Sequence, residues 1–541
     1  MPISAIDKIQ LKAFIDENFY ETGTEMKECT LPDWSDQPEK IISIKDQRLK
    51  RWALKLNEIW RFLCREIDPI VKNEADRFSL LYVPNRFVVP GGRFREFYYW
   101  DAYWIIKGLI ASGMLETSRM MIENFVYMVN QFGFVPNGGR IYYSKRSQPP
   151  LLLGMVYEYY EATQDREFIR KILPTLEQEV KFWEENRNVT VKINDRTYNV
   201  FQYRTVTNVP RPEMYAADKN LVKQITKESE KRRILRDVAS AAESGWDFSS
   251  RWFADKLNLH SIETTNVVPV DLNAYICWNY QILGFLYDIV GDNSKSLEYQ
   301  LKFDDFRNTF QEVFYVKNAS GWYDFNLRTG KHNLDFYPSI ATPLFTQCYY
   351  ALDKRQSDDL FDKMEELGVF HFNGGIPTSI QNTSQQWDFP NGWSPLNHMI
   401  FEGLRKADSP RMQEKAYWLA QKWVLNNYDV YEQTGHMWEK YNVYDIYPQI
   451  GGGGEYDVQA GFGWTNGVIL DLLVSYNQRM NFVLMDGKNS SIIQPGPDII
   501  TTQNLHDPAK LNHANLTFAF SLYAQILLIS LCLFISGNFL Y

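Results

Sequence analysis

Carboxylates beside aromatic residues, arginines and glycines recur in four segments of this 541-residue sequence. The segments are PGGRFREFYYWDAYW (90–104), ESGWDFSSRW (243–252), QWDFPNGWSP (386–395) and EKYNVYDIYPQIGGGGEYDVQAGFGWTNG (439–467). Hydrolysis of a glycosidic bond needs two carboxyl groups, one protonated to assist the leaving oxygen and one ionised. A Trp next to an Asp excludes water from the acid and favours its protonated form. The four segments therefore indicate carbohydrate chemistry.

Signatures of other common chemistries do not occur. The sequence has no HExxH, no phosphate loop ending in Gly-Lys-Ser/Thr and no GxSxG elbow. The run Gly451–Gly454 lacks a preceding apolar strand and the spaced glycines of a dinucleotide fold, so a turned or mobile loop over a ligand fits it better. The seven His show no paired spacing, and the five Cys form no CxxC. We expect no metal ion, no cofactor and no disulfide scaffold.

Composition and charge narrow the class of protein. Apolar residues make up 45% and charged residues 23%, which is typical of a folded globular chain. With 57 basic and 66 acidic residues the formal charge is −9, so we expect no nucleic-acid partner, which would require a basic face. Aromatic residues reach 15%, and their flat faces suit the C–H surfaces of sugars.

Helical periodicity dominates the elements that must position these segments. From residue 49, apolar residues follow the i, i+3, i+4, i+7 spacing of one buried stripe. That stripe consists of Leu49, Trp52, Ala53, Leu56, Ile59, Trp60, Leu63, Cys64 and Ile67. Similar stripes lie within 121–129 and 416–424, separated by long stretches rich in Gly, Pro and Asn, and few alternating strands appear. We predict an all-α scaffold with long functional loops.

The C-terminal residues differ from the rest of the sequence. Residues 516–541 contain no charged side chain and are long enough to cross a bilayer as a helix. A buried terminal helix and a removed lipid-anchor signal are the alternatives. Residues 486–515 are rich in Pro, Gly, Ser and Asn, which is typical of a stalk. We predict a body at 1–485, a stalk at 486–515 and a membrane span or lipid-anchor signal at 516–541.

The N-terminal residues conflict with export. The first 20 residues have no apolar core of a signal peptide. Either the true start is missing, or the protein faces the cytosol and is anchored by its tail. Glycosylation sequons support export weakly, because a chain of this length contains several by chance. They lie at Asn188, Asn318, Asn382, Asn489 and Asn515.

Two of the four segments resemble known signatures. Residues 90–103 and 386–395 are similar to the two signatures of the trehalases of glycoside hydrolase family 37, and the resemblance extends from about residue 49 to residue 476. It implies an (α/α)6 barrel that hydrolyses α,α-trehalose to two glucoses, with inversion at the attacked carbon and no cofactor. Family members usually begin earlier, so the resemblance also implies an incomplete N-terminus. The apolar tail resembles that of membrane-bound animal forms, which implies an extracellular catalytic body.

The resemblance also implies individual roles. Asp247 matches the general acid, Glu439 the general base, and Glu455 a third carboxylate that contacts substrate. The remaining sugar-binding positions fall on Arg93, Trp100, Asp101, Asn137, Arg146, Ser147, Gln148, Arg211, Pro212, Glu213 and Gly245.

Inversion sets a geometric requirement. The two carboxyl groups must lie about 6.5–9.5 Å apart to admit a water, whereas a gap near 5 Å indicates retention. We expect the arginines to keep Glu439 ionised and the apolar wall at Trp246 to keep Asp247 protonated. Two alternatives remain open. One is another inverting glucosidase on the same barrel, and the other is an inactive sugar-binding or scaffold protein, whose expected signature is loss of Asp247 or Glu439. The sequence does not predict the oligomeric state.

Overall fold

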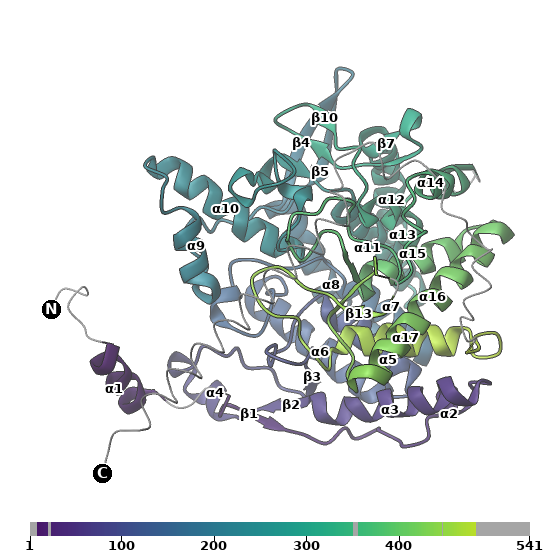
Figure 1. Ribbon diagram of the computed structural model, residues 1–541, viewed down its shortest axis with the longest axis horizontal. Coiled ribbons are helices and arrows are strands. Elements are labelled where there is room, and N and C mark those ends of the chain that lie inside the picture. Colours follow the sequence, from purple (N-terminus) through teal and green to yellow (C-terminus); the bar gives the residue numbers. More distant parts are fainter. Residues whose placement is uncertain (1–7, 20–22, 350–354, 446, 483–541) are drawn as a thin grey trace, which may run out of the picture. The chain divides into compact units, whose positions relative to one another are not determined.

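The computed structural model describes residues 8–19, 23–349, 355–445 and 447–482, and helices predominate in them, as predicted (Figure 1). The helices are α1 (Lys8–Asn18), α2 (Glu39–Ile42), α3 (Gln47–Leu63), α4 (Ile70–Asn73), α5 (Asp101–Ala111), α6 (Leu115–Phe132), α7 (Leu152–Thr163), α8 (Arg166–Asn186), α9 (Tyr215–Leu221), α10 (Glu228–Ser244), α11 (Val270–Ile289), α12 (Asn293–Phe314), α13 (Thr342–Thr346), α14 (Arg355–Glu366), α15 (Ser394–Lys406), α16 (Pro410–Thr434) and α17 (Gly463–Ser475). The described residues belong to one unit, Met1–Leu484.

Six helices of the described chain pack in a closed ring. Helix α5 packs against α7, α7 against α11, and α11 against α13; α13 then packs against α15, α15 against α17, and α17 against α5. Most side chains of α5, α11 and α17 are buried around the whole helix, as expected for helices enclosed by others. The ring is therefore the core of the molecule.

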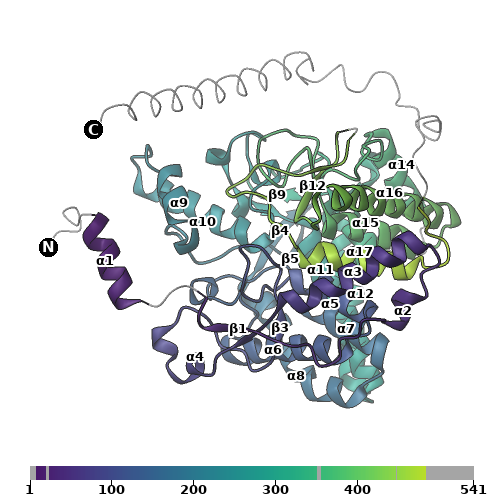
Figure 2. The ribbon, with the colours of Figure 1, turned by 60° about the horizontal axis from the view of Figure 1, so that its bottom comes forward.

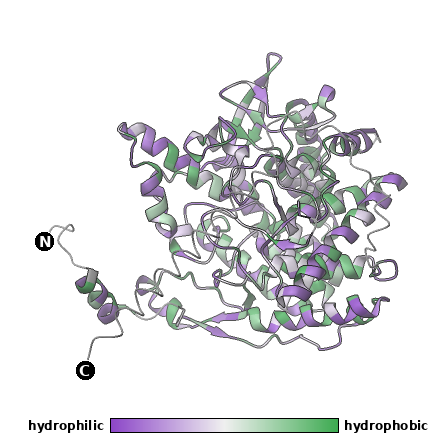
Figure 3. Cartoon of the chain, in the orientation of Figure 1, coloured by the Kyte–Doolittle hydropathy of each residue, from purple (hydrophilic) through white to green (hydrophobic). Residues whose placement is uncertain are grey.

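Amphipathic helices pack against the ring. They are α3, α6, α8, α12 and α16, each of which contacts at least one ring helix. Helix α3 begins after Asp46, whose Oδ1 accepts hydrogen bonds from the backbone N–H groups of Arg48 and Leu49 at 2.8 and 3.0 Å. Its predicted stripe from Leu49 to Leu63 is buried except for Ile59, which is partly buried. These helices carry hydrophilic and hydrophobic residues together (Figure 3). Helices α9 and α10 lie to one side of the ring in both ribbon views (Figures 1 and 2).

The predicted helical stripe is too long by four residues. Helix α3 ends at Leu63, and the next four residues form strand β2 (Cys64–Ile67), which pairs with β1 (Met26–Glu28) and β3 (Phe87–Val88). Apolar positions of a short strand can extend a helical pattern by chance, so periodicity alone did not reveal the change.

The strands of the described chain are short and form five small sheets. The order is β1-β2-β3 in the first sheet, β10-β9-β6 in the second and β11-β12-β13 in the third, while β4-β5 and β7-β8 are two-stranded. The remaining strands are β4 (Asn188–Ile193), β5 (Arg196–Phe201), β6 (Val267–Val268), β7 (Tyr315–Val316), β8 (Gly321–Trp322), β9 (Phe325–Asn326), β10 (Lys331–His332), β11 (Asn391–Trp393), β12 (Lys440–Asn442) and β13 (Gln449–Ile450). The pairing of β11 with β12 places Trp393 opposite Lys440, which joins the second signature to the segment that contains Glu439.

The structure contains two disulfides that the spacing of the cysteines did not predict. Cys29 is bonded to Cys64, and Cys277 of α11 is bonded to Cys348, which follows α13. The partners are 35 and 71 residues apart in sequence, so only the fold brings them together. The bonds are two separate cross-links in a large hydrophobic body rather than a framework that replaces a core.

The predicted stalk at 486–515 and the anchor segment at 516–541 lie outside the described residues. In the ranges that the structure does describe, no helix combines the length and the apolar character needed to cross a bilayer.

Candidate active site

A cavity of about 280 Å³ lies where the loops that precede the ring helices meet. Its wall includes residues from the segments before α5, α7, α11, α15 and α17. The N-terminal ends of these helices therefore converge on one site, and the long loops predicted from the sequence supply its side chains.

The cavity brings most of the predicted site residues together. Both predicted catalytic carboxylates and ten of the predicted sugar-binding residues line it. These are Arg93, Trp100, Asp101, Asn137, Arg146, Gln148, Arg211, Glu213, Gly245, Asp247, Glu439 and Glu455.

Ser147 and Pro212 do not line the cavity. Ser147 is fully buried; its hydroxyl donates to the Val135 carbonyl at 2.7 Å, and its backbone N–H donates to Glu243 at 2.9 Å. Pro212 begins a short 3-10 helix whose next residue, Glu213, faces the cavity. Ser147 is therefore buried behind the wall, whereas Pro212 is exposed beside it.

The cavity wall also contains residues that the sequence analysis did not name. They are Phe94, Glu96, Tyr98, Tyr142, Tyr143, Met214, Ala242, Trp387, Trp393, Tyr456, Phe462 and Trp464. Most of them lie in the four segments that combine carboxylates with aromatic residues, so that pattern could have identified them. Tyr142, Tyr143, Met214 and Ala242 lie outside or at the edge of those segments, and only the fold shows their position.

Asp247 follows the end of α10, where the chain turns sharply into the cavity. Gly245 ends the helix with φ of 78°, a left-handed conformation that glycine adopts without strain. A Cβ at this position would also lie 2.8 Å from ring carbons of Trp100, so the close approach requires glycine. Burial and the charge of Glu455 together raise the pKa of Asp247 to about 7, against the opposing charges of Arg211 and Arg146.

Stacked indole rings exclude water on this side of the site. The Trp246 ring stacks on Trp387 with centroids 5.6 Å apart, and Trp387 stacks on Trp393 at 3.8 Å. Trp387 and Trp393 line the cavity, whereas Trp246 lies behind them. The apolar wall expected at Trp246 is therefore formed at the surface by the tryptophans of the second signature.

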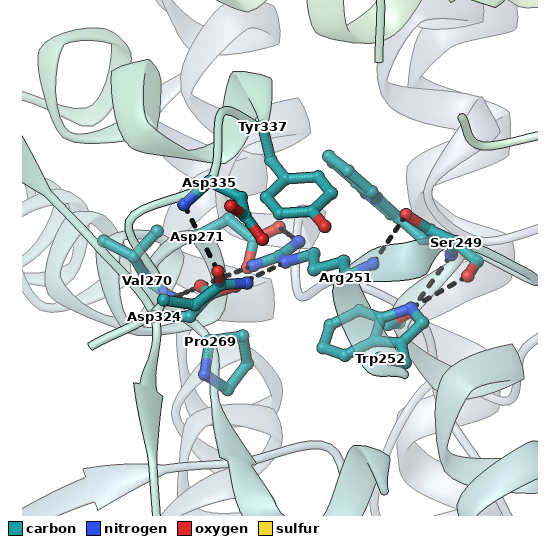
Figure 4. Close-up of polar contacts among 12 residues, drawn as sticks. Ser249, Arg251, Trp252, Pro269, Val270, Asp271, Asp324, Asp335 and Tyr337 are labelled. Carbon is teal, nitrogen blue, oxygen red and sulfur yellow. Dashed lines mark hydrogen bonds and ion pairs between the residues drawn. The ribbon is translucent and has the colours of Figure 1, made fainter. Parts of the chain in front are cut away.

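A buried ion cluster anchors the segment after Asp247 (Figure 4). The Arg251 guanidinium donates to both carboxylate oxygens of Asp271 at 2.7 and 2.8 Å, and to both of Asp324 at 2.8 and 2.9 Å. Its Cζ lies 4.6 Å from the ring centroids of Trp246 and of Trp252. Because Asp271 belongs to the first turn of α11, the cluster ties the Asp247 segment to the ring.

Asp388 of the second signature binds the same segment from another side. Its carboxylate accepts hydrogen bonds from the backbone N–H and hydroxyl of Ser250, both at 2.7 Å, and from the Ser249 hydroxyl at 3.0 Å. Ser379 also donates to it at 2.8 Å. The Asp388 carboxylate therefore holds the segment after Asp247 in place, and it does not line the cavity.

Glu439 directly precedes β12, and polar groups surround its carboxylate. The Tyr456 hydroxyl donates to Oε1 at 2.8 Å, the Gln459 backbone N–H donates to Oε2 at 3.4 Å, and the Lys440 ammonium lies 3.9 Å from Oε2. Burial raises the pKa of Glu439, and these three groups and Arg93 oppose that rise. Lys440 is the largest opposing group, so the expected arginine cluster is not the main charge that favours the ionised form.

Two arginines hold the acidic groups on the opposite side of the cavity. Arg211 is buried and donates to Asp218 at 2.7 Å and to Glu455 at 3.0 Å. Arg146 donates to Asn137 at 2.9 Å and to Glu213 at 2.5 Å. These contacts fix planar groups of N–H donors at the wall, where they could also bind sugar hydroxyls.

Asp101 is a further buried acid at the site. Burial, together with the charges of Glu439 and Asp247, raises its pKa to about 8. In the chain as described, no group of three or more His, Cys, Asp or Glu side chains is arranged to hold a metal ion. The cavity therefore offers protonated and ionised carboxyl groups, arginine donors and indole faces.

Comparison with known proteins agrees with this chemistry. The Trehalase family model matches residues 2–477. The chain belongs to the trehalase family. It is 41% identical over 494 residues to the trehalase of Homo sapiens, covering 91% of this chain and 83% of that protein. It is 40% identical over 495 residues to the trehalase of Oryctolagus cuniculus, covering 91% and 84%.

The fold of this family member resembles that of a distant solved structure. Neutral trehalase Nth1 from Saccharomyces cerevisiae superposes with a TM-score of 0.57 at 18% identity, covering 72% of this chain and 73% of that one. At this identity the likeness concerns the fold alone. Family membership makes the chain a glycoside hydrolase, a trehalase by class.

Proposed function

We propose that this chain hydrolyses α,α-trehalose to two glucoses by an inverting mechanism, with Asp247 as general acid and Glu439 as general base. The observation that supports these roles most is the difference between two carboxyl groups in one cavity. Burial raises the pKa of both groups, to about 7 for Asp247, but the Glu439 carboxylate also has a cation and two hydrogen-bond donors around it that favour its ionised form. An acid that keeps its proton and a base that can ionise are the two groups that the reaction needs.

The proposed reaction is a single displacement. Asp247 gives its proton to the oxygen that joins the two anomeric carbons, and the bond from that oxygen to the attacked carbon breaks. A water attacks the opposite face of the same carbon and gives its proton to Glu439. The buried arginines Arg146 and Arg211 orient sugar hydroxyls, and the indole wall excludes other water.

We further propose that the closed ring forms the inner layer of an (α/α)6 barrel. In chain order the outer and inner helices alternate: each outer helix α3, α6, α8, α12, α14 and α16 precedes an inner helix, α5, α7, α11, α13, α15 and α17 respectively. Helices α9 and α10 are then an insertion before α11 that carries Arg211 and Asp247 at its two ends.

Stereochemistry tests the mechanism directly. Fresh trehalose should give equal initial amounts of α- and β-glucose, because the attacked glucose inverts and the leaving glucose keeps its α configuration. Proton NMR of the anomeric signals in the first minutes measures this before mutarotation. Release of α-glucose alone would refute inversion, and hydrolysis of maltose in preference to trehalose would favour the broader glucosidase instead.

We also infer that the body works in an oxidising, extracellular compartment and is held at the membrane by residues 516–541. Two disulfides support this inference, because such bonds persist mainly outside the cytosol. The sequon residues Asn188, Asn318 and Asn382 are all exposed, as attachment of a glycan requires.

Enzymatic deglycosylation tests the compartment. Protein isolated from its native cells should lose mass on treatment with an N-glycosidase, and Asn-to-Gln replacement at an occupied site should reproduce one step of that loss. The full chain should be found in the membrane fraction, whereas a chain truncated after residue 485 should be found in the soluble fraction. An unglycosylated, reduced protein in the cytosolic fraction would contradict the inference.

A further inference from the structure

Lys440 has an unusual position for a lysine that the mechanism above does not use. Its side chain is fully enclosed. The ammonium donates to Gln386 Oε1 at 2.7 Å and to the Gly453 carbonyl at 3.4 Å, and it lies 3.9 Å from Glu439 Oε2. It also lies 5.1 Å from the ring centroid of Trp393 and 5.3 Å from that of Tyr456.

Gln386 extends the contact from Lys440 to the other predicted catalytic residue. An ammonium group can only donate hydrogen bonds, so the amide must turn its oxygen toward Lys440. The amide nitrogen then faces the opposite way and donates to the backbone carbonyl of Asp247 at 2.6 Å. Glu439, Lys440, Gln386 and Asp247 therefore form one continuous chain of contacts behind the cavity.

Neither Lys440 nor Gln386 lines the cavity. The reacting atoms of a bound sugar would contact the carboxyl groups and not these two side chains. Lys440 can therefore act on the reaction through its charge, which attracts the charges of Glu439 and Asp247, or through its contact with Gln386. A purely structural role, in which Lys440 only fills space between β12 and the second signature, is the simpler alternative.

The charges around Glu439 show why a cation matters there. Asp101 of α5 and Asp247 are acids at the same cavity, and Arg93 is the other nearby cation. Tyr456 donates to Glu439 but carries no charge while it does so. Burial lowers the pKa of Lys440, while Glu439 and Asp247 oppose that change and favour the charged ammonium. Lys440 lies 3.9 Å from the Glu439 carboxylate. It acts on Asp247 through its charge and through Gln386, which donates to the Asp247 backbone carbonyl.

We propose that Lys440 is a positioning residue that makes Glu439 the base of the pair and, through Gln386, fixes the backbone of the acid Asp247. The proposal rests on the roles proposed above for the two carboxyl groups. The ammonium stabilises a negative charge on Glu439 in a site that otherwise favours protonated acids. The same ammonium sets the orientation of the Gln386 amide, so the acid and the base are held by one group.

The variant Lys440→Met tests the charge with little change of volume. The acidic limb of the kcat/KM profile should move to higher pH by about one unit or more. An opposite charge this close normally lowers the pKa of a carboxyl group by one to three units, and the variant removes that charge from Glu439. Activity at a pH below that limb should fall by about tenfold, since one pH unit is a tenfold change in the ionised fraction. KM for trehalose at the pH optimum should change little, because Lys440 does not contact the sugar.

The variant Gln386→Met separates the two parts of the proposal. It removes the bridge but keeps the ammonium beside Glu439, so kcat should fall while the acidic limb stays in place. Equal shifts of the acidic limb in both variants would show that the charge of Lys440 does not cause the shift. An unshifted limb in Lys440→Met, with trehalose still cleaved by the wild-type chain, would overturn this inference and leave the proposed function intact.

A third variant controls for loss of folding. Lys440→Met leaves a buried carboxyl without its cation, and Glu439→Gln combined with Lys440→Met removes both charges. The double variant should recover any loss of melting temperature seen in Lys440→Met. If the double variant does not recover the melting temperature, and the acidic limb of Lys440→Met is unshifted, Lys440 has only a packing role. Failure of the wild-type chain to hydrolyse trehalose would refute the proposed function itself.

Discussion

Replacing Glu439 with glutamine lowers kcat on trehalose by about 10²- to 10⁴-fold, the usual contribution of a general base. An amide has the size of the carboxyl group but cannot accept the proton of the attacking water. Tyr456 and Lys440 still surround the site, so the cavity keeps its shape. Steady-state kinetics at saturating trehalose measures the effect, and KM should change much less than kcat.

The control for this prediction is an exposed glutamate changed in the same way. Glu432 lies in α16 with its side chain exposed, so Glu432→Gln should keep wild-type kcat. Wild-type turnover in Glu439→Gln would exclude Glu439 as the base. The other acids of the cavity, Asp101 and Glu455, would then be the next residues to change.

Replacing Asp247 with asparagine removes turnover to a similar extent, because the leaving sugar loses its proton donor. The carboxyl group of the wild-type chain should donate below its pKa of about 7, so kcat/KM should fall as pH rises through that value. The Asn variant should lose this basic limb in its residual activity. A profile that keeps the limb would assign the proton to another group.

The same substitution should leave folding intact. The folded pKa of Asp247 lies above its unfolded value near 3.9, so the folded state holds a proton that the unfolded state has released between about pH 4 and pH 7. Stability therefore falls across this window as pH rises, and the buried carboxylate is a cost above it. Asp247→Asn avoids that cost, and its melting temperature at pH 8 should equal or exceed that of the wild-type chain. The exposed Asp359→Asn in α14 is the matched control and should change neither activity nor stability.

Much of the helical body could be predicted from the sequence because a buried stripe has a regular period. The stripe of α3 is visible in sequence and buried in the structure, whereas its continuation into Cys64 and Ile67 was wrong. A four-residue strand carries too few positions to show its own period. The pairing of Cys277 with Cys348 depends on where α11 and α13 lie, and the spacing of cysteines along the chain carries no such information.

The site shows the same difference between local and long-range information. Asp247, Glu439 and Arg93 belong to segments that are continuous in sequence, and the cavity brings them together with Arg146 and Arg211, which lie outside those segments. The contribution of Lys440 was not predicted, because its contact with Gln386 crosses 54 residues of sequence.

The Arg251 cluster has a consequence for how the enzyme fails under heat. Loosening of the turn that carries Asp247 would withdraw Arg251 from Asp271 of α11 and from Asp324 and would leave buried charges unpaired. The free energy needed to unfold the turn that carries Asp247 is therefore close to that needed to unfold the helices around it. Thermal inactivation should then follow collapse of the whole helical body, without an earlier stage in which an otherwise folded molecule has lost its acid.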